Sequence, residues 1–155
     1  MKRVLVVFDT KFGNTEQIAR DIASGINETG FTETVVVGIK QAEDQDLSSF
    51  DGVLFGAPVH AFRATRGIKR TVKRIAKKGL AGKLVAAFET YQISSHAGNC
   101  TRQIVKEFKK SAPDAKFSSL SLSSLVEGYD GPLNEAEPAK AQEFGRRFAQ
   151  ELTQG

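Results

Sequence analysis

The stretch VLVVFDTKFGNT (residues 4–15) runs from five apolar residues into a polar loop that contains a single glycine. An apolar run of this length predicts a buried strand, and apolar side chains at helical spacing follow over 14–27. A loop between a strand and a helix N-terminus offers free backbone N–H groups and the positive end of the helix dipole to an anion. Gly13 lets the backbone approach the anion closely, and Thr10 and Thr15 supply hydroxyl donors. The stretch therefore predicts a phosphate-binding loop.

The pattern of this loop narrows the kind of phosphate. A dinucleotide-binding loop needs three glycines, and a Walker loop ends in Gly-Lys-Ser/Thr. Here only Gly13 is present, and Lys11 comes before it rather than after it. The alternative is a strand–helix turn that holds no ligand, because Asn14 and Thr15 are also good helix caps.

The rest of the chain alternates apolar runs with helical patterns. The runs at 34–39, 53–56 and 84–88, like the first at 3–8, are apolar on both faces, as in strands of a parallel sheet that is covered on both sides. A weaker run at 117–122 alternates with serines, which predicts an edge strand with one solvated face.

Helices are predicted over 14–27, 66–78 and 101–110, and a last one begins at Asn134. Asn134 followed by Glu137 is close to a capping box. The segment 39–50 holds at most a short helix, around residues 46–50.

Five strands that alternate with about five helices predict an α/β fold, a single domain over 1–155 with a doubly wound parallel sheet and helices on both faces. Ligands of such sheets bind beyond the carboxyl ends of the strands, where the winding reverses. The functional loops are therefore expected at 9–15, 57–65 and 89–99.

Four segments resemble the flavodoxin family. TKFGNT (10–15) resembles its phosphate loop, Thr/Ser-x-x-Gly-Asn-Thr, and DGVLFGAP (51–58) its third strand and the following loop. FETY (88–91) resembles the fourth strand and flavin loop, and GPL (131–133) the run before the last helix. The resemblance covers the whole chain, without the insertion of long-chain members. It implies a short-chain flavodoxin with strand order 2-1-3-4-5 and FMN as cofactor at the switch point.

The resemblance also implies the cofactor-binding residues, with aromatic side chains stacked on the flavin ring. They are Thr10, Lys11, Phe12, Gly13, Asn14 and Thr15 for the phosphate, and Ala57, Pro58, Val59, His60, Phe62, Thr90, Tyr91, Gln92, His96 and Gly98 around the ring. His60 is interpreted as functional, whereas His96 is in a flavin loop either by function or by chance. The fourth-strand loop departs from the Gly-Ser/Thr-Tyr-Gly-Trp common in relatives, because it reads ETYQI (89–93). Ile93 replaces the tryptophan, so one stacking face is weaker or is supplied by Tyr91.

The segment 63–78 carries eight Lys and Arg residues and no acidic residue, in a chain of net charge +4. Because like charges four residues apart repel, a solvated helix face is normally of mixed sign. The run indicates an anionic partner, or else a general preference for a basic surface. Known flavodoxins are mostly strongly acidic, so this basic chain departs from the family. We expect the basic face to steer acidic redox proteins, such as a ferredoxin or a reductase, toward the flavin. The docking residues are expected to be Arg63, Arg66, Lys69, Arg70 and Lys73. No nucleic-acid recognition module is visible.

The sequence is therefore interpreted as a low-potential electron carrier, in which non-covalently bound FMN shuttles electrons between redox proteins. Catalytic residues and metal ligands are not expected, because the cofactor supplies the chemistry. One alternative is a small flavin-dependent oxidoreductase of the quinone or protoporphyrinogen type, with His60 or Tyr129 as proton donor. A second is a receiver-like domain, but that would need paired acidic residues after the first strand, where only Asp9 is present.

The place of the protein in the cell is expected to be the cytoplasm. No stretch approaches the roughly 18 apolar residues that a membrane span needs. The lone Cys100 suits a reducing compartment.

Overall fold

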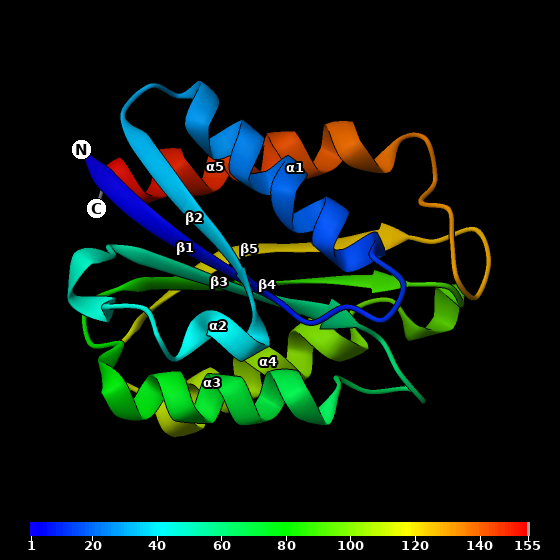
Figure 1. Ribbon diagram of the computed structural model, residues 1–155, viewed down its shortest axis with the longest axis horizontal. Coiled ribbons are helices and arrows are strands. Elements are labelled where there is room, and N and C mark those ends of the chain that lie inside the picture. The colour runs from blue at the N-terminus through cyan, green and yellow to red at the C-terminus, as the bar shows by residue number, and fades with distance from the viewer. Residues whose placement is uncertain (155) are drawn as a thin grey trace.

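The computed structural model describes residues 1–154, which form one parallel sheet between two layers of helices (Figure 1). The strands are paired in the order β2-β1-β3-β4-β5, all parallel, which confirms the predicted topology. Their bounds are β1 Lys2–Phe8, β2 Thr32–Gly38, β3 Gly52–Pro58, β4 Leu84–Tyr91 and β5 Lys116–Leu125.

The helices lie on both faces of this sheet. Helices α1 (Asn14–Glu28) and α5 (Glu137–Gln154) cover one face, and α3 (Arg66–Gly79) and α4 (Asn99–Ser111) cover the other (Figure 1). The connection between β2 and β3 contains the one-turn helix α2 (Ile39–Ala42) and a 3₁₀ turn at Leu47–Ser49. The prediction for 39–50 was right about the second element and missed the first.

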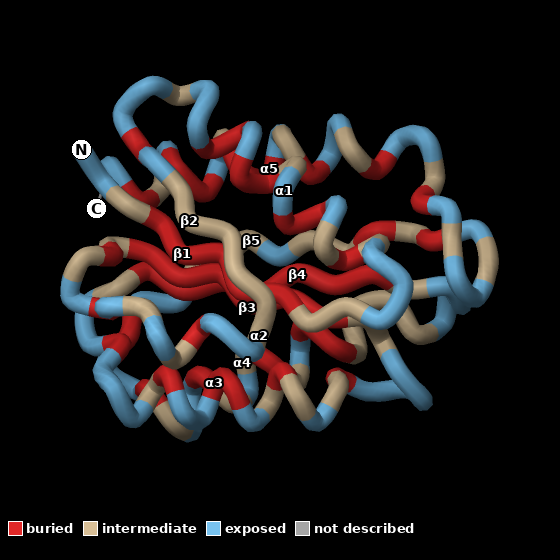
Figure 2. The backbone as a smooth tube through the Cα atoms, viewed as in Figure 1, coloured by how far each residue is buried: buried red, intermediate tan, exposed pale blue. Residues whose placement is uncertain are grey.

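Alternating side chains of the strands feed two cores. On β1, Leu5 and Val7 join the core beneath α3 and α4, whereas Val4 and Val6 join the core beneath α1 and α5. All four of these residues are fully buried, and the central strands are largely buried along their length (Figure 2). Because side chains on both faces of β1 are buried, its sequence is an unbroken apolar run.

The two edge strands differ from the central ones. Strand β5 alternates and packs Leu120 and Leu122 against the core, as predicted. Strand β2 was predicted to be covered on both faces, but from residue 34 onward it is only half-buried, because it has a neighbour on one side only. An apolar run in the sequence does not by itself distinguish an edge strand from a central strand.

The last helix begins at Glu137, three residues later than predicted. Asn134 does not form a capping box, because its N–H donates to the Leu125 carbonyl and its Oδ1 accepts from the Ala136 N–H at 2.9 Å. Pro138 then occupies the first turn, where a missing N–H costs nothing.

Helices α1 and α5 touch backbone to backbone through two glycines. A Cβ added at Gly25 would lie 2.0 Å from the Gln142 carbonyl oxygen, and one at Gly145 would lie 2.1 Å from that of Ile22. This contact fixes α1, and with it the loop at its N-terminus, against the rest of the fold. Within residues 1–154, no helix is long and apolar enough to cross a membrane.

Candidate functional site

The carboxyl ends of the strands lie on the right in Figure 1. A cavity of about 690 Å³ opens there. It lies between the loops that follow β1, β3, β4 and β5. The structure brings together all the residues predicted for a cofactor site except Gly13, Ala57 and Gly98, which do not line the cavity.

The loop after β1 presents an open helix N-terminus. Gly13 has φ of 92°, a left-handed conformation that favours glycine, and it precedes α1 without any side-chain cap. Its own N–H donates to Thr10 Oγ1 at 2.9 Å. Within residues 1–154, the backbone N–H groups of residues 14–16 have no protein acceptor. A Cβ at Gly13 would find no atom within 4 Å, so the approach to these donors is open.

Neither residue proposed as an ordinary cap acts as one. Thr15 is buried, and its hydroxyl shares a hydrogen bond of 2.8 Å with the hydroxyl of Thr90 at the end of β4. Ser124, the register partner of Thr90 on β5, is also buried, and its Oγ has no partner among the described residues. The Thr15 hydroxyl is therefore turned toward β4, and the backbone N–H groups at the N-terminus of α1 stay available to an anion.

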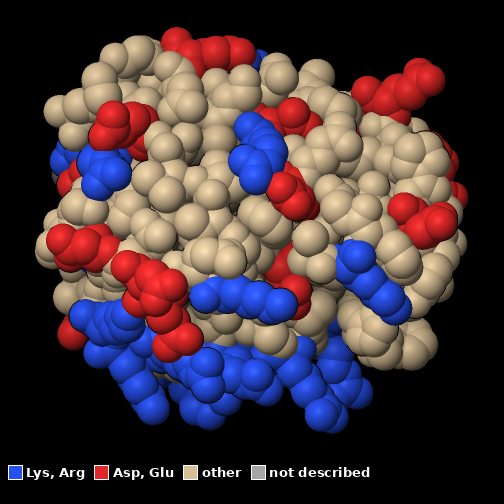
Figure 3. Space-filling view, in the orientation of Figure 1, with Lys and Arg blue, Asp and Glu red and all other residues tan. Residues whose placement is uncertain are grey.

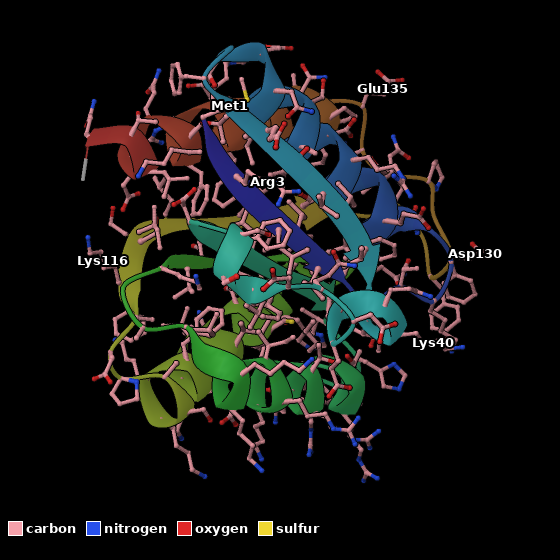
Figure 4. The ribbon with its side chains drawn as sticks, turned by 60° about the vertical axis from the view of Figure 1, so that its left-hand side comes forward. Met1, Arg3, Lys40, Lys116, Asp130 and Glu135 are labelled. Carbon is pink, nitrogen blue, oxygen red and sulfur yellow. The ribbon has the colours of Figure 1, made fainter. Side chains whose placement is uncertain are left out.

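The loop between β5 and α5 forms a wall that sequence reasoning did not assign to the cofactor site. Tyr129 lines the cavity, and its ring meets that of Phe12 edge-on with centroids 5.2 Å apart. Its hydroxyl accepts a hydrogen bond of 2.7 Å from Lys11 Nζ. Asn14 Nδ2 donates to the Asp130 carbonyl at 3.2 Å, and Figure 4 shows Asp130 on this loop beside the start of α1. Only GPL (131–133) hinted at this wall, because a loop has no periodicity to interpret.

The loops after β3 and β4 meet at the cavity mouth. His60 and Arg63 exchange two backbone hydrogen bonds, of 2.7 and 3.1 Å, around a turn in which Ala61 and Phe62 both have positive φ. This turn holds the Phe62 ring outward, 64% exposed, with its centroid 4.4 Å from that of His96. Ile93 also lines the mouth and is half-exposed, so an aliphatic rather than an aromatic side chain stands at this position.

Glu89, the first residue of the unusual ETYQI sequence (89–93), has a structural role in the loop between β4 and α4. This fully buried carboxylate accepts the Gly98 N–H at 2.6 Å and the Thr101 N–H at 2.9 Å, and so caps α4 from the end of β4. Gly98, predicted in the cofactor site, has φ of 89° and serves this cap. Cys100 in the same turn is buried against Ala57, whose carbonyl accepts from its thiol. Burial, and secondarily Glu89, raises the pKa of this thiol, so it fits a packing role.

Asp9 fixes the other side of the cavity. Its carboxylate accepts a hydrogen bond of 2.6 Å from the Thr65 hydroxyl, which in turn accepts the Ile68 N–H at the start of α3. These two hydrogen bonds tie this side of the cavity to the first turn of α3.

Comparison with known proteins gives this arrangement a family. A family model described as a flavodoxin domain matches residues 5–122. The chain belongs to the flavodoxin family. Among curated relatives, a flavodoxin of Clostridium saccharobutylicum is 26% identical over 88 residues, 57% of this chain and 55% of that protein. A flavodoxin of Aquifex aeolicus is 31% identical over 70 residues, 45% of this chain and 38% of that protein. These matches span about half the length of the relatives or less.

Solved structures agree on the fold. A flavodoxin from the domain Archaea has a TM-score of 0.78 at 15% identity, and the match covers 97% of this chain and 99% of that one. Flavodoxin 1 of Bacillus cereus has a TM-score of 0.76 at 22% identity over 96% and 98%. The rubredoxin:oxygen oxidoreductase of Desulfovibrio gigas reaches 0.81 at 17% identity, but the match covers only 37% of that longer chain.

The cavity offers groups suited to a phosphate and to a planar ring, the two parts of a flavin nucleotide. One end offers unpartnered backbone N–H groups at a helix N-terminus, and the other is lined by the rings of Phe62, Tyr91 and His96. Its volume lies within the range of about 300–1,000 Å³ that small-molecule sites occupy. Within residues 1–154 no group of His, Cys, Asp and Glu could hold a metal ion.

Proposed function

We propose that this protein is a low-potential electron carrier that shuttles electrons between redox proteins through non-covalently bound FMN. The observation that carries the proposal is the difference between the two ends of the cavity. The open α1 N-terminus suits a phosphate, and the aromatic mouth at the other end suits a planar ring. FMN, when bound, supplies the redox chemistry, by accepting and releasing electrons.

The residues divide between the two ends of FMN. Thr10, Thr15 and the N–H groups of residues 14–16 would hold the phosphate, and Lys11 would add positive charge beside it. The loops at Pro58–Phe62 and Thr90–His96 would hold the ring, and their aromatic side chains would exclude water from its faces. Glu89 has a positioning role, because it shapes the second of these loops through α4.

Purified protein provides the direct test. We expect a yellow solution that releases one FMN per chain on denaturation, and a colourless protein that does not bind added FMN would refute the proposal. A carrier should also be inert toward NAD(P)H unless a reductase is added. Rapid oxidation of NAD(P)H by the protein alone would favour the flavin-dependent oxidoreductase instead.

The partner is proposed to be an acidic redox protein that docks beside the cavity mouth. Arg63, Arg66 and Arg70 are exposed at the start of α3 and have no ion pair among the described residues. Opposite charges on a partner would accelerate association, and salt would slow it within a Debye length of about 8 Å at physiological ionic strength. We expect electron transfer to slow steeply as ionic strength rises, so a flat salt profile would contradict this docking.

The same charges bear on the reduction potential of the flavin. A basic surface stabilises a reduced, negatively charged ring, so the potential should be less negative than in acidic members of the family. Spectroelectrochemical titration measures it, and a value equal to or below theirs would contradict the argument. The cytoplasmic location is part of this proposal, since a lone buried thiol suits a reducing compartment.

A further inference from the structure

The two helical layers of this protein carry opposite charge. Helices α3 and α4 together hold eleven Lys and Arg residues and a single acidic residue, Glu107. Helices α1 and α5, on the other face, hold four basic and six acidic residues. In Figure 3 the blue side chains crowd along the lower edge, where α3 lies, and in Figure 4 long nitrogen-tipped side chains point away from the sheet there. The basic layer is defined as Arg66, Lys69, Arg70, Lys73, Arg74, Lys77, Lys78, Arg102, Lys106, Lys109 and Lys110.

Most of this charge is not neutralised by the protein itself. Within residues 1–154, only Lys73 and Arg74 of the basic layer form ion pairs, with Glu107 at 3.8 Å and with Glu43 at 3.3 Å. Every other member except Lys69 is exposed outright. Folding has therefore brought two cationic helices side by side, at a cost in mutual repulsion, and the described residues supply counter-charges to only two of the eleven cations.

The half of the basic layer that lies away from the cavity does not suit a specific protein interface. Such interfaces have apolar or aromatic anchors at their centre and few lysines. The large hydrophobic side chains exposed in the described residues all lie outside α3 and α4. The charge also continues from Arg66 to Lys77, about 16 Å along the helix axis and away from the cavity. A protein docked at the cavity mouth would leave this far half unused.

We propose that the far half of the basic layer, on the C-terminal halves of α3 and α4, is a docking surface for an anionic lipid membrane, to which the protein binds peripherally. A bilayer with acidic headgroups is flat, extended and diffusely charged, so it can meet the far-half cations of both helices without shape complementarity. The acidic layer of α1 and α5 then faces away from the membrane. The cavity, at the edge of the sheet, opens along the membrane plane. This inference rests on the charge layer alone and does not depend on the bound cofactor.

Vesicle sedimentation of the full chain tests it. The probes are vesicles of phosphatidylcholine alone and vesicles that contain phosphatidylserine, at low salt. The test variant combines K77Q, K106Q, K109Q and K110Q, four far-half cations that have no ion pair among the described residues. The control combines K2Q, K116Q, K140Q and R147Q, which removes the same charge from exposed sites outside the basic layer. Two of these residues, Lys2 and Lys140, form ion pairs with Asp51 at 4.0 Å and with Glu137 at 3.6 Å, so the free energy of unfolding of both variants is measured alongside.

We expect binding to the phosphatidylserine vesicles only. Since each cation near an anionic surface contributes about fivefold in affinity, the test variant should lose at least about a hundredfold. The control should lose less than about tenfold, because its substitutions lie off the docking face. Equal losses in the two variants, or no binding by the unsubstituted chain, would overturn the proposal. Tighter binding to a DNA duplex than to the vesicles, at the same salt, would overturn it in favour of nucleic acid.

Discussion

Replacement of Glu89 by glutamine tests how the loop between β4 and α4 is held. The carboxylate is fully buried and accepts two N–H groups, from Gly98 and Thr101, at 2.6 and 2.9 Å. Glutamine has one acceptor oxygen, so its amide nitrogen would face a donor and leave one buried N–H unpaired, at about 1–3 kcal/mol. Loss of the charge at the N-terminus of α4 adds about 0.3–1 kcal/mol. Removal of a buried charge returns part of this cost, because the neutral amide is easier to desolvate.

The sum of these contributions favours the carboxylate over the amide, because the Gly98 and Thr101 N–H groups have no other acceptor among the described residues. We expect E89Q to lower the free energy of unfolding by about 2 kcal/mol. With a slope of about 1–3 kcal/mol per molar urea, the midpoint falls by about 1 M. FMN titration of the apoprotein should show weaker binding as well, because Gly98 ends the flavin loop. The exposed pair Glu143–Arg146 provides the control, since E143Q should cost less than about 1 kcal/mol. If E89Q unfolded at the same urea concentration as the unsubstituted protein, the proposed cap would be refuted.

Three further predictions concern the backbone contacts and the thiol. G13A should lower the free energy of unfolding by about 1–2 kcal/mol and weaken FMN binding. A Cβ at this position meets no atom within 4 Å, but φ of 92° is a strained conformation for any residue with a side chain. Unchanged stability in urea would contradict this prediction. G25A should cost about 3 kcal/mol or more by forcing α1 away from α5, whereas S24A on the exposed side of the same helix should be nearly neutral in the same assay. Since burial raises the pKa of Cys100, its thiol should stay protonated and resist iodoacetamide at pH 8 until the protein unfolds; rapid labelling of folded protein would show that the site is open.

The sequence predicted the parts of the fold that rest on local pattern. Central strands are buried on both faces and therefore read as apolar runs, and the helices show their buried stripes at helical spacing. The open turn before α1 was also predictable, because its glycine, Gly13, has the positive φ that the sequence pattern requires. That this turn binds phosphate stays a prediction. The strand order came with the family resemblance, since topology is not written in any single segment.

Other features arose only when distant segments met. The half-buried state of β2 depends on its having one neighbour, and the wall at Tyr129 depends on where a loop without periodicity comes to rest. Glu89 looked like a departure from a pattern, but packing places it opposite two N–H groups nine and twelve residues away. The basic run of α3 was visible in the sequence, yet only the sheet sets α4 beside it. Local sequence fixes periodicity and backbone preference, whereas neighbours, burial and surface charge are properties of the folded chain.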